Sequence, residues 1–209
     1  MRTRFESLPE DKQTRIREVC IQEFVNHGYE QASTNRMTER AGISKGLLFH
    51  YFGSKGDLFL YLVDYVSGYF YDRFLAAPLE TPGDIFDRIT FWGLKKLQMF
   101  ADNPLYYQFL MLAFLDRPKD LEGALAQRYQ MLSERGYGLL LKDLDTSRFR
   151  EDIDQAKAVE TILMTMDGLG KKYMELLRNV PDRGLSRMEE IRQEIEEYQR
   201  ILQVGIYRP

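Results

Sequence analysis

The sequence predicts an all-α protein of about nine helices, in which a small three-helix N-terminal head precedes a larger helical body. Apolar residues recur at helical spacing over long stretches, and no segment shows a convincing alternation with a period of two. All seven prolines fall where helices would begin or end, and an interior proline would cost a helix about 3 kcal/mol. The predicted helices span residues 8–27, 34–41, 45–52, 56–76, 83–101, 104–115, 119–143, 154–178 and 186–204.

Two short helices joined by a tight turn are predicted between residues 34 and 52. The hydroxyls of Ser33 and Thr34 can open the first helix, and Gly42 allows the positive φ that ends it. Ser44 can cap the next helix by accepting a backbone N–H. Helix, turn and helix in this order are typical of DNA-binding proteins. A three-helix cap in any all-α protein could show the same caps, so the turn alone leaves that alternative open.

The second of these helices is predicted to present two different faces. Steps of about 100° per residue place Leu48 and Phe52 on a packing side. The opposite side carries Gly46, Phe49 and His50. Gly46 costs about 1 kcal/mol of helix propensity against Ala, so we expect a partner to come close to the backbone there. Since the N–H groups of the first turn can also hold a phosphate, the pattern predicts a recognition helix that lies in a DNA groove.

The residues around this helix closely resemble the signature of TetR-type transcriptional regulators. The motif is GISKGLLFHYFGSK at residues 42–55. The resemblance extends upstream over residues 24–29 and 32–34 and covers about the first quarter of the chain. Weaker features of that family's ligand-binding domain follow at residues 149–154 and 166–169. The resemblance implies a DNA-binding head and a helical body that binds a small molecule.

The resemblance also implies which residues contact DNA. By position these contacts fall on Thr34, Arg36, Ser44, Lys45, Gly46, Leu47, Phe49, His50 and Lys55. The chain departs from the family where Leu47 replaces a common Thr, Phe49 replaces a common Tyr, and Thr38 replaces a small Ala. Two hydroxyls that would bond DNA are therefore missing. We hypothesise that Leu47 and Phe49 instead contact thymine methyl groups.

The charge distribution fits DNA binding at one end of the chain. The 209 residues carry a net charge of −3, but residues 1–56 hold nine Lys or Arg against seven acids, so the remainder carries −5. We therefore predict a helix-turn-helix DNA-binding domain over residues 1–56 and a ligand-binding and dimerisation domain over residues 57–209. The aromatic stripe of the predicted helix 56–76 fits either interdomain core or an element that transmits motion.

The middle of the chain is rich in aromatic residues and Met. Such residues are core residues by default. The family that the chain resembles keeps an inducer pocket in this region, and walls of Met and aromatic side chains suit a flexible lipophilic ligand. The candidate ligand-binding residues are Trp92, Tyr107, Phe114, Tyr129, Met164 and Asp167.

Two late helices carry apolar stripes that are candidates for an oligomer interface. The stripe residues are Ile162, Met166, Leu169, Tyr173, Ile191, Ile195, Tyr198 and Leu202. Their periodicity alone fits packing within one chain as well as an interface between two chains. In the TetR family the last two helices pair with their mates in a four-helix bundle, so the resemblance favours a homodimer. A dimer would present two recognition helices about 34 Å apart to a palindromic operator.

Several other classes of protein are disfavoured by the sequence. Cys20 is the only cysteine, so no intrachain disulfide can form, and no stretch approaches the about 20 apolar residues of a membrane span. The N-terminus lacks the apolar region of a signal peptide, so we expect a cytoplasmic protein. The chain has two histidines and no phosphate loop, nucleotide-binding glycine motif or nucleophile elbow. We therefore expect no enzymatic activity, no metal and no cofactor.

The sequence thus predicts a ligand-responsive transcriptional regulator. We expect a repressor that binds palindromic operator DNA as a homodimer and is released by a small lipophilic molecule. The alternative is a dimeric helical carrier of small molecules without sequence-specific DNA binding, which the missing hydroxyls at Leu47 and Phe49 make conceivable. Selection of DNA from random duplexes would discriminate the two, because a carrier would prefer no sequence.

Overall fold

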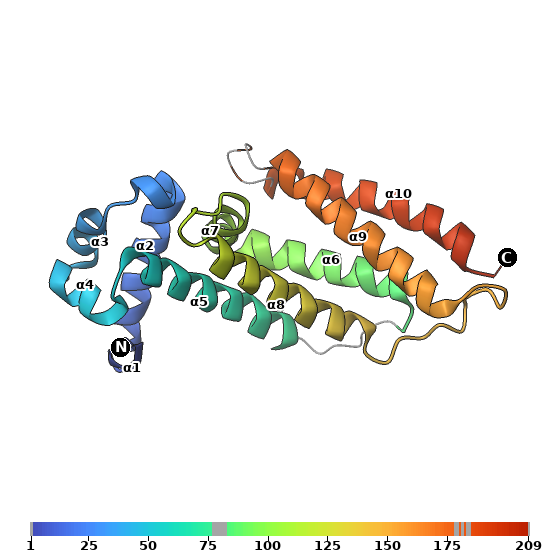
Figure 1. The fold of residues 1–209 in the computed structure, drawn as a ribbon, viewed down its shortest axis with the longest axis horizontal. Helices are drawn as coiled ribbons and strands as arrows, with labels where there is room; N and C mark the ends of the chain where they lie inside the picture. The colour runs from blue at the N-terminus through green and yellow to red at the C-terminus, as the bar shows by residue number, and fades with distance from the viewer. Residues whose placement is uncertain (1, 77–82, 178–179, 181, 183–184, 209) are drawn as a thin grey trace. The chain divides into compact units, whose positions relative to one another are not determined.

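The predicted all-α fold class is confirmed by the computed structural model, which describes residues 2–76, 83–177, 180, 182 and 185–208 (Figure 1). The described helices are α1 (Arg2–Glu6), α2 (Glu10–Gln31), α3 (Thr34–Ala41), α4 (Lys45–Phe52), α5 (Lys55–Ala76), α6 (Ile85–Asp102), α7 (Pro104–Leu115), α8 (Glu122–Leu141), α9 (Gln155–Leu177), a 3₁₀ helix (Leu185–Arg187) and α10 (Met188–Ile206). The described residues contain no strand, and their β-type pairing is limited to two isolated bridges. None of the described helices is both long enough and apolar enough to cross a membrane.

Most helices lie where the sequence places them. The bounds of α3, α4 and α7 coincide with the predicted ranges, and the ends of the other predicted helices differ by four residues at most. The sequence analysis missed α1, because five residues are too few to show a helical period. Within α2, Gly28 has φ 69° and breaks the regular helix directly after the predicted end at residue 27. The positions Pro78, Pro82, residue 178, Pro181 and Pro209 lie outside the described residues.

The chain divides into two compact units. The first comprises Met1–Asp72 and Asn103–Leu132, and the second comprises Arg73–Asp102 and Ser133–Pro209. The first unit therefore contains the predicted head together with most of α5, all of α7 and the first half of α8. The predicted domain boundary after residue 56 stays a prediction.

The core of the first unit is aromatic. α2 packs against α3 and α7, and Phe24 on α2 is fully buried. Its ring lies 4.9 Å from the ring of Phe59 on α5 and 6.2 Å from the ring of Phe109 on α7. Cys20, one turn earlier on α2, is also fully buried, and this burial raises the pKa of its thiol to about 12. The thiol therefore stays protonated and unreactive.

The second unit is built around α6, α9 and α10. α10 packs against both other helices, and α9 and α10 run side by side in opposite directions (Figure 1). Phe86 and Ile162 belong to its buried core. Arg88 on α6 is buried too, and its guanidinium donates to the carbonyl oxygens of Leu140 at 2.7 Å and Lys142 at 2.6 Å. These hydrogen bonds join the C-terminal end of α8 to α6.

Candidate functional site

The helix-turn-helix forms through the caps that the sequence predicts. The Ser33 side chain accepts the N–H of Arg36 at the start of α3. Gly42 ends α3 with φ 71° and ψ 35°, in the left-handed region that favours glycine. The Ser44 hydroxyl accepts the N–H of Leu47 at 3.1 Å and so begins α4. Short-range hydrogen bonds therefore set both ends of the turn.

α4 presents one buried face and one exposed flank. Leu48 and Phe52 are buried, as the helical spacing predicts, and Tyr51 is buried beside them. The predicted contact residues of the flank differ in exposure, since Leu47 and Phe49 are half-buried. Its exposed members are Ser44, Lys45, Gly46 and His50. The flank is thus open to a partner along the first turn and a half of the helix.

A buried carboxylate on α2 holds the beginning of α3. Glu23 is only 1% exposed. Its Oε1 accepts the N–H of Ser33 at 3.0 Å and Nε of Arg36 at 2.8 Å, and His27 Nε2 lies 3.7 Å from its Oε2. Burial raises the pKa of Glu23, but the hydrogen bonds from Arg36 and Ser33 and the charges of Arg36 and His27 outweigh burial and lower this pKa overall. Glu23 is therefore held in its charged form.

Two predicted DNA contacts, Arg36 and Lys55, are bonded to the protein itself. Arg36 pairs with Glu23, donates to the carbonyl oxygen of Gln31 at 3.0 Å, and keeps 47% of its side chain exposed. The Lys55 ammonium donates to the carbonyl oxygens of Tyr29 at 2.9 Å and Glu30 at 3.2 Å at the end of α2. Both side chains hold the head together, whatever they contribute to DNA binding.

The last predicted contact, Thr34, begins α3 and is half-buried. Thr38, one turn later, is buried and donates its hydroxyl to the carbonyl oxygens of Thr34 and Asn35, at 3.0 Å each. Bonding to its own helix satisfies this hydroxyl at a position where the family usually has Ala.

Arg4 on α1 lies beside the predicted contact flank, and the sequence analysis missed it. Its Nη1 lies 2.8 Å from Nε2 of His50, and both side chains are exposed. Because a guanidinium can only donate, the ring nitrogen accepts this hydrogen bond. Phe5 holds α1 in place, since it is fully buried and its ring lies 4.8 Å from that of Phe52. The only signal in the sequence was a basic N-terminus without a helical period.

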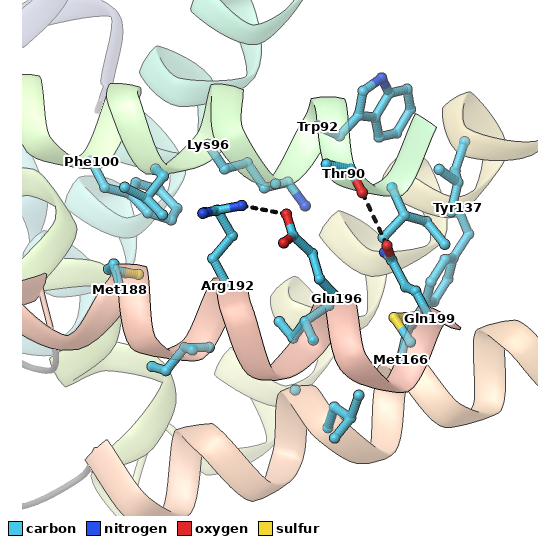
Figure 2. Close-up of a pocket in the computed structure, with 18 residues that line it drawn as sticks. Thr90, Trp92, Lys96, Phe100, Tyr137, Met166, Met188, Arg192, Glu196 and Gln199 are labelled. Atoms are coloured by element: carbon cyan, nitrogen blue, oxygen red, sulfur yellow. Dashed lines mark hydrogen bonds and ion pairs between the residues drawn. The ribbon is translucent and has the colours of Figure 1, made fainter. Parts of the chain in front are cut away.

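The second unit contains a cavity of about 340 Å³. Its walls come from α6, α8, α9 and α10 and are mostly apolar. The polar side chains that line it are Thr90, Lys96, Arg192, Glu196 and Gln199. Figure 2 shows Lys96 on α6 and Arg192 and Glu196 on α10 projecting into the space between these two helices. The volume lies at the lower end of the range for small-molecule sites.

Of the six predicted ligand-binding residues, one lines this cavity. Trp92 lines the cavity. Tyr107 and Phe114 are buried in the first unit, where the ring of Tyr129 lies 5.4 Å from that of Phe114. On α9, Met164 is 68% exposed and Asp167 pairs with Lys171 at 2.6 Å.

Aromatic content does not distinguish a core from a cavity wall. Polar residues within an apolar helical stripe, such as Lys96 and Gln199, were the signal that the sequence analysis left unused.

The predicted interface stripes pack against one another within the chain. Ile162, Leu169 and Tyr173 on α9 are buried. Ile191, Ile195 and Tyr198 pack against the pair Leu169 and Tyr173, while Met166 and Leu202 pack against the core that contains Ile162. Intrachain packing, the alternative that periodicity left open, therefore covers part of each stripe, and the other five residues are half-buried. The assignment of these residues to a dimer interface stays a prediction. Other apolar residues of α9 and α10 are exposed, namely Met164 at 68%, Leu176 at 56%, Ile201 at 70% and Val204 at 84%.

The fold and the exposed flank of α4 define a helix-turn-helix, the arrangement that is typical of DNA-binding regulators. Residues 16–62 match the family model of bacterial regulatory proteins of the tetR family. Residues 83–207, more than half of the chain, match the tetracyclin repressor-like C-terminal domain. The chain therefore belongs to the TetR family of transcriptional regulators.

Similar proteins agree with this assignment. The HTH-type transcriptional repressor AcnR of Corynebacterium glutamicum is 43% identical over 56 residues, which cover 25% of this chain and 30% of AcnR. The HTH-type transcriptional repressor SCO4008 of Streptomyces coelicolor is 36% identical over 96 residues, 46% of each chain. The match thus spans less than half the length of these relatives. A TetR family transcriptional regulator from Chloroflexus aurantiacus has a similar structure, with a TM-score of 0.60, 25% identity and coverage of 99% of this chain and 98% of the other.

Replacing Glu23 by Gln tests the role of the buried carboxylate. We expect Glu23→Gln to lower the free energy of unfolding at neutral pH by about 2 kcal/mol, because charged hydrogen bonds to Arg36 and Ser33 are lost. Since the pKa of Glu23 in the folded protein lies below its ordinary value of 4.5, this stabilisation is present above pH 4.5 and is lost as the pH falls through the folded pKa. Chemical denaturation of both proteins at neutral and acidic pH measures the difference. Glu18→Gln, at an exposed position of the same helix, is the control, and a difference that does not shrink in acid would contradict the assignment.

Proposed function

We propose that this protein is a repressor that binds a palindromic operator as a homodimer and releases it when a small lipophilic molecule enters the cavity of the second unit. In this proposal it acts in the cytoplasm and catalyses no reaction. The single observation that carries the proposal is the exposed flank of α4, in which Ser44, Lys45, Gly46 and His50 face outward while Leu48 and Phe52 are buried.

The first turn of α4 suits a close approach to DNA. A Cβ added at Gly46 would meet no protein atom within 4 Å, so packing within this chain does not require glycine there. A DNA groove that comes close to the helix backbone would require glycine there. The Lys45 ammonium has no protein partner among the described residues and is free for a phosphate or a base edge. Leu47 and Phe49, half-buried beside it, are placed to offer apolar contact to thymine methyl groups.

Lys45→Ala tests this assignment. We expect weaker binding to every DNA sequence and a salt dependence whose slope falls by about 1, because one phosphate contact is lost. The operator is first selected from random duplexes with the wild-type protein, and fluorescence anisotropy then measures its affinity at several salt concentrations. Lys157→Ala, at an exposed position of α9, is the control. An unchanged affinity and slope would rule out Lys45 as a contact, and failure of the wild-type protein to select any sequence would favour the carrier function.

The exposed apolar residues of α9 and α10 support the proposed homodimer. Met164, Ile201 and Val204 are large apolar side chains on the outer faces of two adjacent helices, and a second copy of the chain would remove them from water. A homodimer would also carry two copies of α4, one for each half of a palindrome.

Charges placed on this surface test the dimer. We expect the double variant Ile201→Glu and Val204→Glu to sediment as a monomer where the wild-type protein sediments as a dimer, because two carboxylates would have to be desolvated at the interface. The affinity for the operator should fall when the dimer is lost. Leu94→Glu makes the same change at a 47% exposed residue of α6 and should leave the dimer intact. A double variant that still sediments as a dimer would place the interface elsewhere.

Coupling between the cavity and the operator is the remaining part of the proposal. A ligand that releases DNA is expected to lower operator affinity by about 5- to 150-fold at saturation, and reciprocity requires the operator to weaken ligand binding by the same factor. Titration of the releasing compound with and without operator measures this factor. Equal ligand affinities in the two titrations would eliminate the allosteric model.

A further inference from the structure

The cavity of the second unit contains hydrogen-bond donors that the protein does not satisfy. Gln199 is only 4% exposed. Its Oε1 accepts the hydroxyl of Thr90 at 3.0 Å, whereas its Nε2 has no hydrogen-bond partner. A buried amide N–H that stays unpaired is costly, so such a group in a cavity wall indicates an acceptor that the protein itself does not supply.

A positive charge without a counter-charge lies in the same wall. Lys96 lines the cavity, and its ammonium makes no hydrogen bond or ion pair to any described residue. Lys96 as a residue is exposed, and its side chain projects into the cavity (Figure 2), where desolvation lowers the pKa of the ammonium. A bound anion would offset that penalty.

The other charges of the cavity are already paired. Arg192 Nη1 bonds Glu196 on the same helix (Figure 2), and its remaining nitrogens bond the exposed Glu189, with Nε at 2.9 Å from the carboxylate. The one acid that lines the cavity is therefore balanced by Arg192. A cationic ligand would have to displace Arg192 from Glu196 and would also face Lys96, so the charge arrangement opposes it.

The rest of the wall is apolar and suits a hydrocarbon chain. The apolar side chains that line the cavity include Leu97, Phe100, Leu169, Ile191 and Ile195. Gly93 and Gly170 also line the cavity, and a Cβ added at either would meet no atom within 4 Å. The cavity therefore has open space beside α6 at Gly93 and beside α9 at Gly170.

We propose that the ligand is an apolar monoanion of medium length, with a carboxylate that binds Lys96 and Gln199 and a hydrocarbon tail that lies against the apolar wall. This inference rests on the proposed function, since it takes the cavity to be the site of the releasing molecule. The carboxylate accepts from both unpaired donors and is acceptor-only, which matches a wall whose free groups are donors.

Three straight-chain probes of equal length and different charge test the ligand class. Trp92 is the only tryptophan of the chain and lines the cavity, so its fluorescence reports binding of decanoate, decanol and decylammonium. We expect decanoate to bind at least about tenfold more tightly than decanol, because hydrogen bonds to charged groups are strong. Decylammonium should bind most weakly. Lys96→Met should remove the preference for decanoate, while Lys157→Met on the exposed side of α9 should keep it.

A cavity-filling variant separates this inference from the proposed function. Gly93→Leu places a side chain in the free space, and it should weaken all three probes without lowering the thermal stability, because leucine is the better helix former. If decylammonium binds as tightly as decanoate, or if Lys96→Met keeps the preference, the anionic class is wrong, and weakening by Gly93→Leu still leaves the cavity as the binding site. If no probe binds, or if Gly93→Leu changes none of the affinities, the cavity is not the ligand site. This inference and the ligand-release step of the proposed function then both fail, whereas operator binding through α4 is tested separately by Lys45→Ala.

Discussion

The buried carboxylate of Glu23 is the interaction on which the DNA-binding head depends. A charge that is 1% exposed is tolerable only when donors surround it, and here the donors are the first residues of the helix-turn-helix. Ser33 and Arg36 bond Glu23, so the start of α3 is tied to α2 by electrostatics as well as by apolar packing. Because α3 leads through the tight turn at Gly42 into α4, the direction of the exposed flank follows from this contact.

A second polar contact ties α2 to α5 within the same unit. Arg17 is buried, pairs with Glu10 at 2.6 Å, donates to the hydroxyl of Tyr61 at 3.4 Å, and lies 4.1 Å from the ring centroid of Tyr65. The pKa of Arg17 is raised despite its burial, through Tyr61, Tyr65 and Glu10. The exposed flank of α4 therefore belongs to a unit that is fixed at several points, which suits a surface that must match a rigid groove.

Three lysines show how the environment decides the role of one side chain. Lys45 is exposed and unpaired, so its charge is available to a polyanion at low desolvation cost. Lys55 binds the carbonyl oxygens at the end of α2 and closes that helix. Lys96 faces a cavity, where burial lowers its pKa and no acid balances it. The sequence alone gives each of them the same charge, and only their neighbours separate the proposed DNA contact, the lysine that closes α2 and the proposed ligand contact.

The sequence by itself determined the all-α class and the bounds of α3 and α4, because caps, prolines and a left-handed glycine act through hydrogen bonds and sterics within a few residues. The inward face of α4 also followed from its local period. The tertiary structure decided which partner covers each apolar stripe. It placed Leu169 and Ile195 against each other, left Ile201 and Val204 in water, and buried Tyr107 within the first unit. The physical reason is that periodicity shows which face of a helix is apolar, whereas burial depends on the element that covers that face, and that element is distant in sequence.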